Sequence, residues 1–240
     1  MTTLIRSEFL QLRTLRSSYA TAVTLVVLTV GLAWGDVADS QITDPAEHFA
    51  SAVLVGAGFV TALVGALFAA ARVAGDYRYA TIVNRVLATP GRTKLLMGRL
   101  VSFSILGILS GLVATALAVV TAAAVLDAEG TAVVVSAGDA AGYVARIVAA
   151  AVLFTSLGAL LGFLLRSQQA AMVAIFGTFL AEKALASALG DVASVLPFAS
   201  LNQLLDPTTD GALVAGLVLL ATTVGLTGLA AALLRRRDIQ

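Results

Sequence analysis

The sequence contains no cysteine, a single histidine and little charge for its length. Of its 240 residues, 12% are charged and 59% are apolar, whereas a soluble domain is about 25% charged and about 45–50% apolar. Without cysteine there can be no disulfide, no thiolate catalysis and no zinc–thiolate site. That much apolar surface cannot be buried inside one soluble domain of this size. The composition therefore excludes a soluble enzyme, a disordered chain and a disulfide-stabilised secreted module.

Several kinds of catalytic site are also missing from the sequence. Neither lysine follows a glycine, so the chain has no Gly-Lys-Ser/Thr phosphate-binding loop. The histidine, His48, lies in an acidic loop, which leaves no histidine base or histidine metal site in the apolar segments. Paired aspartates within those segments, which an intramembrane aspartyl protease needs, are absent too. We therefore expect that the chain is not an enzyme and carries no cofactor or metal of its own.

Six segments are long and apolar enough to predict transmembrane helices. A bilayer core of about 30 Å requires roughly 20 apolar residues in a helix, and a helix satisfies its own backbone polar groups in lipid. The predicted spans comprise residues 19–34, 49–71, 100–126, 141–165, 170–189 and 212–234. The first span is short, but no cleavage site of a signal peptide follows Trp34. The expected fold class is an all-α integral membrane protein, with residues 1–240 forming one domain.

The basic residues gather on one side of these spans. Thirteen of the 15 Lys and Arg residues lie before the first span, between spans two and three, between spans four and five, or after the sixth. Most acidic residues lie in the alternate loops. Because cytoplasmic loops accumulate Lys and Arg, the pattern predicts a multi-pass protein of the plasma membrane with both termini in the cytoplasm.

Three ionisable residues lie inside the predicted spans, namely Arg146, Glu182 and Lys183. Ionisable residues within spans often mark functional sites. All three are near the outer boundary, however, where long side chains can reach water. The sequence leaves a functional and a structural role open for each of them.

Residues 2–18 predict an amphipathic helix that lies on the inner leaflet before the first span. Five apolar residues share one side of this helix: Leu4, Ile5, Phe9, Leu12 and Leu15. The residues expected to contact the membrane interface are Arg6, Phe9, Arg13 and Arg16. In an alternative interpretation, the arginines only fix the orientation of the chain.

The longest cytoplasmic loop, residues 74–99, is itself organised. Ile82, Val83, Val86 and Leu87 share one face of a short predicted helix. Pro90 ends that helix, and a second short helix over residues 92–99 leads into the third span. The apolar ridge is surrounded by basic residues, and it predicts either a hairpin that rests on lipid head groups or a docking surface for a cytoplasmic partner.

Two further patterns concern packing. The outer connection, residues 190–211, contains the apolar runs 192–198 and 201–205, which predict short re-entrant or interfacial helices. Small residues recur at helix-packing spacing in three spans: Gly58, Ala62, Ala66 and Ala70, then Gly107 and Gly111, then Gly158 and Gly162. These rows indicate a closely packed bundle.

The leader and the cytoplasmic loop together resemble permease subunits of the type-2 ATP-binding-cassette (ABC) exporter family. In that family the leader has an acidic residue followed by spaced basic ones, matched here by Glu8, Arg13 and Arg16. The loop of the family reads acidic-x-Arg-x-x-Thr and then Leu-x-x-Pro-x-Arg. The matching residues, in order, are Asp76, Arg78, Thr81, Leu87, Pro90 and Arg92. Asp76 stands where glutamate is common in the family.

The resemblance implies a six-helix half-transporter with residues 2–18 as an interfacial elbow helix. It implies that a separate cytoplasmic ATPase dimer binds Mg-ATP, that a second permease chain, identical or homologous, completes the pore, and that nucleic acid is not a partner. The implied ATPase-coupling residues are Asp76, Tyr77, Arg78, Thr81, Ile82, Val83, Val86, Leu87, Pro90 and Arg92. The implied outer gate lies in residues 190–211 and includes Val195, Leu196 and Phe198.

The near-absence of charge within the spans favours a hydrophobic or amphipathic substrate, such as a drug, a peptide antibiotic or a lipid. Phe59, Phe68, Phe176 and Phe179 are candidates for lining its path, although aromatic residues in a bundle more often face lipid or the core. The alternatives from other classes are a non-transporting sensor or assembly subunit, an ion-coupled carrier and a membrane enzyme that acts on lipids.

Overall fold

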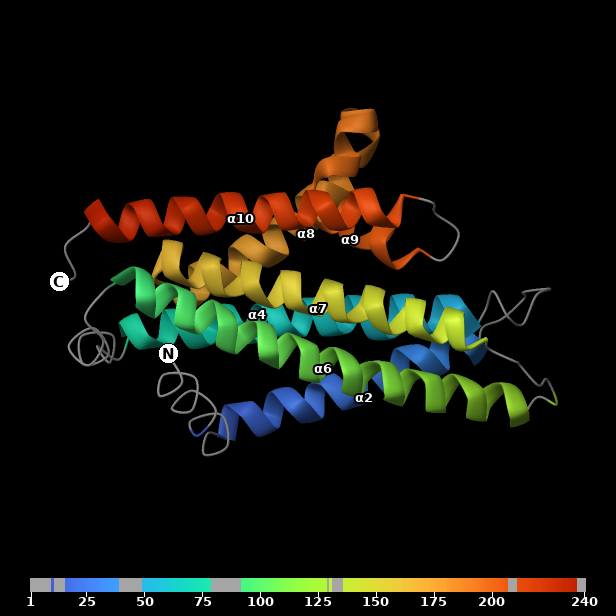
Figure 1. Ribbon diagram of the computed structural model, residues 1–240. Helices are drawn as coiled ribbons and strands as arrows, with labels where there is room; N and C mark the ends of the chain where they lie inside the picture. The colour runs from blue at the N-terminus through green and yellow to red at the C-terminus, as the bar shows by residue number, and fades with distance from the viewer. Residues whose placement is uncertain are drawn as a thin grey trace.

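The computed structural model describes residue 10 and residues 16–38, 49–78, 92–128, 130, 136–206 and 211–236. Within these ranges the fold is all-α, as the sequence predicted (Figure 1). The long helices are α2 (Arg16–Ala38), α4 (Val60–Arg78), α6 (Arg92–Ala128), α7 (Ala137–Leu165), α8 (Gln168–Leu189) and α10 (Ala212–Arg236). The shorter elements are the π-helix η1 (Ala52–Phe59), the 3₁₀-helix η2 (Gly190–Val195) and the α-helix α9 (Pro197–Leu205).

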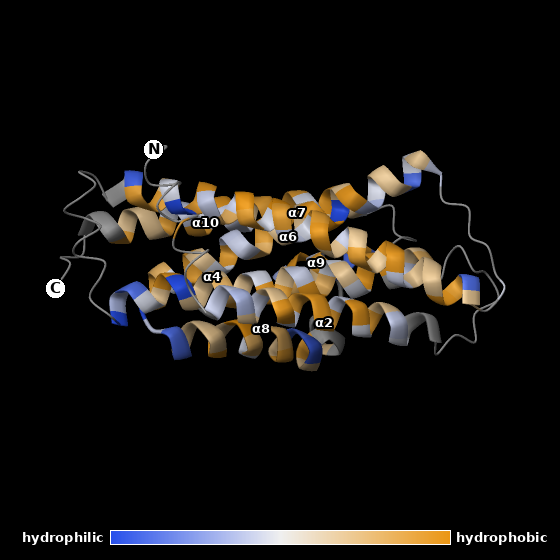
Figure 2. Ribbon diagram, turned by 90° about the horizontal axis from the view of Figure 1, so that it is seen from below, coloured by the Kyte–Doolittle hydropathy of each residue, from blue (hydrophilic) through white to orange (hydrophobic). Residues whose placement is uncertain are grey.

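The long helices lie side by side in a bundle whose central member is α7. Helix α7 packs most extensively against α4 and α6, and it also contacts η1, α10 and α8. The C-terminal half of α8 rises away from the other long helices, and α9 lies beside α10 (Figure 1). Hydrophilic residues gather toward the helix ends, while the middle of the bundle is apolar (Figure 2).

The two ends of the bundle differ in charge. At the end drawn at the left of Figure 1, α2 and α6 begin and α4, α7 and α10 finish. Arginines occupy these positions: Arg16, Arg78, Arg92, Arg166 and Arg236. The opposite end carries Asp127, Asp139 and Asp206. We refer to them as the basic end and the acidic end.

Among the described residues, five helices are long and apolar enough to cross a membrane. They are Ser17–Gly35, Phe49–Arg78, Lys94–Ala128, Ala137–Leu165 and Ala212–Leu233. These helices are consistent with a multi-pass membrane protein. The sequence predicted six spans, and the missing one corresponds to α8. Between the polar Gln169 and the charged Glu182, its run of residues 170–181 is only about 18 Å long at 1.5 Å per residue.

Glycines permit the close crossings of α7 with α4 and α6. A Cβ atom at Gly158 would overlap the carbonyl oxygen of Ala66, and one at Gly162 would lie 2.8 Å from that of Ala70. At the other crossing, a Cβ atom at Gly107 would lie 2.8 Å from the Cα atom of Val152. The rows of small residues seen in the sequence therefore lie where helix backbones meet.

Two local features differ from the sequence-based expectations. Residues 92–99 do not form a separate short helix: they are the first turns of α6, which continues to Ala128. No proline interrupts this stretch, and a single glycine, Gly98, costs only about 1 kcal/mol in a helix and does not end it. The start of the second predicted span, η1, is a π-helix, a rare form that is frequent at functional sites.

Candidate functional site

At the basic end, a buried ion pair joins α4 to α6. The carboxylate of Asp76 binds the guanidinium of Arg99, and the two side chains are 13% and 2% exposed. The guanidinium carbon of Arg99 also lies 6.0 Å from the centre of the Phe163 ring of α7. One arginine of α6 therefore contacts side chains of both α4 and α7.

A second contact at the basic end joins α4 to the end of α7. Arg166 follows α7 in the left-handed conformation, with φ 54°, and its backbone N–H donates to the carbonyl of Gly162 at 3.1 Å. This ends the helix and directs the guanidinium carbon to 5.3 Å from the centre of the Tyr77 ring, a cation–π distance. Asp76 and Tyr77 thus attach the last turn of α4 to two neighbouring helices.

The predicted coupling residues are only partly placed. Asp76, Tyr77 and the exposed Arg78 form the end of α4, and Arg92 begins α6. The rest of the predicted docking surface lies outside the described residues: Thr81, Ile82, Val83, Val86, Leu87 and Pro90. The interface residues Arg6, Phe9 and Arg13 also lie outside them, whereas Arg16 is the first residue of α2.

At the acidic end, the short helix α9 packs against the bundle through one apolar face. Phe198, Leu201, Leu204 and Leu205 are buried. The side chain of Leu205 occupies the space that a Cβ atom at Gly58 of η1 would fill. Proline at the first position of α9 fixes the helical φ angle and lacks the N–H that would have no partner there.

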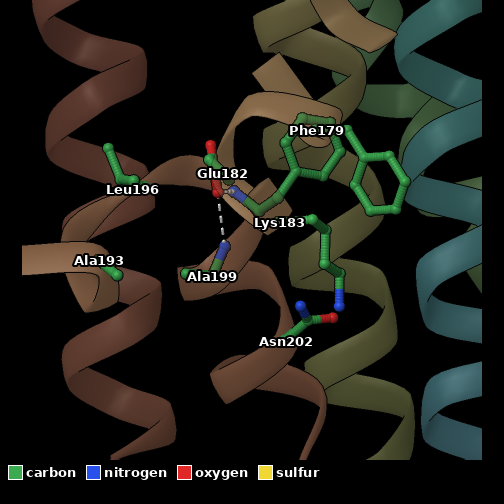
Figure 3. A pocket seen from close by; sticks show the side chains of 8 residues that line it. Phe179, Glu182, Lys183, Ala193, Leu196, Ala199 and Asn202 are labelled. Atoms are coloured by element: carbon green, nitrogen blue, oxygen red, sulfur yellow. Dashed lines mark hydrogen bonds between the residues drawn. The ribbon is translucent and has the colours of Figure 1, made fainter. Parts of the chain in front are cut away.

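Both ends of α9 are bound by charged side chains from the long helices. Glu182 of α8 accepts hydrogen bonds from the backbone N–H groups of Phe198 and Ala199, each 2.9 Å from its Oε2 (Figure 3). Arg146 of α7 donates from Nη1 to the carbonyl oxygen of Asp206, the C-cap residue of α9, at 2.8 Å. The anion therefore lies at the positive end of the helix dipole and the cation at its negative end.

Four phenylalanines from four elements meet around the start of α9. The ring of Phe198 lies 5.2 Å from Phe154 of α7 and 5.3 Å from Phe179 of α8, measured between ring centres. Phe179 lies 5.7 Å from Phe59 of η1. The rings meet at tilted or edge-on angles, which favour aromatic packing. Phe59 and Phe179 are therefore core residues that support α9.

Two residues predicted for the substrate path, Phe68 and Phe176, lie apart from this cluster, whereas the predicted gate residues lie beside it. Phe68 packs in a second core near the basic end, and Phe176 is 45% exposed on α8. Val195 is exposed at the end of η2, whereas Leu196 is half-buried before α9. The gate residues thus come together around α9. The four phenylalanines predicted for the substrate path, Phe59, Phe68, Phe176 and Phe179, do not form one path.

A small pocket opens between α8 and α9, with space of about 100 Å³. Glu182, Lys183, Asn202 and Leu196 line it, together with Phe179 and Phe198 (Figure 3). Sites for drug-sized ligands measure about 300–1,000 Å³, so this pocket is too small to hold such a molecule. Among the residues that the structure describes, no cluster of His, Asp and Glu could hold a metal ion.

The sequence did not assign the roles of Glu182 and Arg146 at α9. Glu182 is only 8% exposed, so it does not extend to water as a residue at a span boundary could. Two features of the sequence pointed to these roles. Arg146 and Glu182 carry opposite charges inside apolar segments, and Pro197 begins an apolar run in the connection that follows Glu182.

The described helices define the class of this chain as a helical protein consistent with several membrane crossings. A comparison with models of known protein families found no match, and a search of curated proteins found none either.

Proposed function

We propose that the chain is the membrane-spanning subunit of an ATP-driven exporter in the plasma membrane, with both termini in the cytoplasm. ATP binding and hydrolysis take place in a separate cytoplasmic ATPase dimer, because this chain has no phosphate-binding loop. A second permease chain, identical or homologous, completes the translocation path. The resemblance of residues 76–92 to type-2 ABC permeases supports the proposal. So do the five long apolar helices and the separation of charge between the two ends of the bundle.

The proposal counts six crossings, with α8 as the fifth. Helix α8 begins at the basic end, where α7 finishes, and α10 begins at the acidic end (Figures 1 and 2). The carboxylate within α8, Glu182, accepts two backbone hydrogen bonds and is buried. A buried, hydrogen-bonded carboxylate is tolerated inside a membrane protein when it faces protein and not lipid.

The observation that carries the proposal is the attachment of the proposed coupling loop to the bundle. The helix before residues 79–91 is bound through Asp76 and Tyr77, and the helix after them is bound through Arg99. Both helices pack tightly on α7. A displacement of the loop by an ATPase is therefore transmitted to α4, α6 and α7 together, which is how packed helices move between two arrangements.

The substrate is hydrophobic or amphipathic, and its path is formed mainly between two permease chains. The pocket beside α9 is too small for a drug, a peptide antibiotic or a lipid. Helix α8 exposes apolar side chains, among them Val173, Phe176 and Leu180, which suit contact with a second chain or with an apolar substrate.

Docking is tested by placing a charge on the apolar ridge of the loop. We expect Leu87→Asp to prevent co-purification of the chain with its cassette ATPase, because docking buries an uncompensated charge. The matched control is Asn84→Asp, which adds the same charge on the opposite face of the predicted helix and leaves co-purification intact. Normal co-purification of the Leu87→Asp variant contradicts the coupling assignment.

A further inference from the structure

We infer that Glu182 and Arg146 are positioning residues that hold α9 in place, and that α9 moves away from the bundle when either contact is lost. Both side chains belong to long helices, and each binds one end of α9. The role of this movement as the opening of an outer gate rests on the proposed exporter function. The holding of α9 by the two charges does not.

Glu182 performs the capping that the chain around α9 does not provide. The first N–H groups of a helix have no partner within it, and the N-cap residue, Leu196, has no side chain that accepts a hydrogen bond. Oε2 of Glu182 accepts from two of these groups, those of Phe198 and Ala199. Charge-assisted hydrogen bonds of this kind are about twice as strong as neutral ones.

Arg146 acts at the opposite end in the same sense. It binds the carbonyl oxygen of Asp206, beyond the last turn of α9, where the helix dipole is negative. Glu182 lies on α8 and Arg146 on α7, so α9 is held between two long helices by contacts that span 16, 17 and 60 residues of the sequence. A relative displacement of α7 and α8 therefore breaks one of the two contacts.

The surroundings of α9 leave room for this movement. Helix α9 has nine residues, and the pocket between α8 and α9 leaves space on the side of Glu182 and Asn202. The second carboxylate oxygen of Glu182, Oε1, is buried without a hydrogen-bond partner among the described residues. Among the described residues, the hydrogen bonds to its buried carboxylate come from α9, which makes the position of α9 sensitive to this side chain.

The test uses a cysteine reporter in α9. The chain has no native cysteine, so Ser200→Cys introduces a single thiol at a residue that is 0% exposed. Purified full-length protein is placed in lipid nanodiscs, where both membrane faces are accessible and no orientation is assumed. The measured quantity is the rate at which a charged, water-soluble maleimide labels the thiol.

We expect Glu182→Ala and Arg146→Met to increase the labelling rate of the Ser200→Cys reporter about tenfold or more, since each removes charged hydrogen bonds. Glu182→Gln should give an intermediate increase, because the amide oxygen still accepts a hydrogen bond but carries no charge. The matched control is Lys183→Gln, which removes a charge from the adjacent residue in the same pocket and should leave the rate unchanged.

A second reporter distinguishes local release from unfolding. Ser102→Cys, at a residue 5% exposed in α6, should stay slow to label in every variant. The inference is overturned if Glu182→Ala and Arg146→Met leave the Ser200→Cys rate unchanged, if Lys183→Gln raises it equally, or if the Ser102→Cys rate rises in parallel.

The gate role has a separate measurement. In the complex with the cassette ATPase, ATP should accelerate labelling of the Ser200→Cys reporter, and in the Glu182→Ala variant labelling should already be fast and independent of ATP. If the charge variants release α9 but ATP has no effect on the reporter in the otherwise unaltered chain, the positioning role stands and the gate role is refuted, together with the coupling on which it rests.

Discussion

Substitution of Gly158 by alanine tests the tightest helix crossing of the bundle. Helices α4 and α7 approach so closely that a Cβ atom at Gly158 would overlap the backbone carbonyl of Ala66. A backbone group cannot rotate away as a side chain can, so the two helices must separate to admit a methyl group. Overpacking of this kind costs about 1–3 kcal/mol.

The matched control is Gly228→Ala in α10. A Cβ atom there would meet nothing within 4 Å, so this substitution keeps only the gain in helix propensity, about 1 kcal/mol. Both variants share that gain, because both glycines lie in long helices. We therefore expect Gly158→Ala to have a free energy of unfolding about 1–3 kcal/mol lower than that of Gly228→Ala.

The loss in the free energy of unfolding should be larger where the added Cβ atom lies closer to the neighbouring helix. Gly162→Ala places its Cβ 2.8 Å from the Ala70 carbonyl oxygen, and Gly111→Ala places it 3.1 Å from the Cα atom of Val148. The expected order of destabilisation is therefore Gly158→Ala, Gly162→Ala and then Gly111→Ala. The assay is equilibrium unfolding by sodium dodecyl sulfate in mixed micelles, followed by circular dichroism. If Gly158→Ala and Gly228→Ala unfold at the same detergent fraction, the α4–α7 crossing is wrong.

Three further predictions use the same unfolding assay or amide exchange. Phe198→Leu should lower the free energy of unfolding by about 2 kcal/mol, because Phe198 is 4% exposed and packs on two rings. Phe176→Leu, at a residue that is 45% exposed, should lower it little, and equal losses in the two variants contradict the aromatic cluster. Arg166→Ala should be less stable than Arg166→Gly by about 1 kcal/mol, since φ is 54° and both variants lose the contact with Tyr77; the reverse order refutes the left-handed cap. Ser136→Ala removes the N-cap of α7, which should destabilise the start of that helix by about 1 kcal/mol. Backbone amides in the first turn of α7 should therefore exchange several times faster, and unchanged exchange argues against the cap.

Hydropathy predicted the all-α class and the long apolar helices because each span is defined by its own residues. It did not determine whether α8 is a membrane span. The run of 12 residues between Gln169 and Glu182 is shorter than the roughly 20 apolar residues that a span requires, and α8 is not among the five helices long and apolar enough to cross a membrane. Whether such a segment is stable in a membrane depends on what binds the charge, and the partners of Glu182 lie 16 and 17 residues further along the chain.

The contacts at the candidate site could not be predicted from the sequence either, because they also join residues that are distant along the chain. The small-residue rows predicted close packing, but not that Gly158 faces Ala66 or that Gly58 admits Leu205. The 60-residue separation of Arg146 and Asp206 leaves no local pattern to read. The coupling motif is the opposite case, since the sequence defines it clearly while residues 79–91 lie outside the part of the chain that the structure describes.

The most direct test of the proposed function is transport in inside-out membrane vesicles that contain the chain together with its cassette ATPase. We predict that a hydrophobic fluorescent cation accumulates only with Mg-ATP, that vanadate abolishes accumulation, and that collapse of the ion gradients leaves it intact. Accumulation that survives vanadate but is lost with the ion gradients would show an ion-coupled carrier and contradict the account. Absence of ATP-dependent accumulation for any hydrophobic or amphipathic probe would contradict it as well.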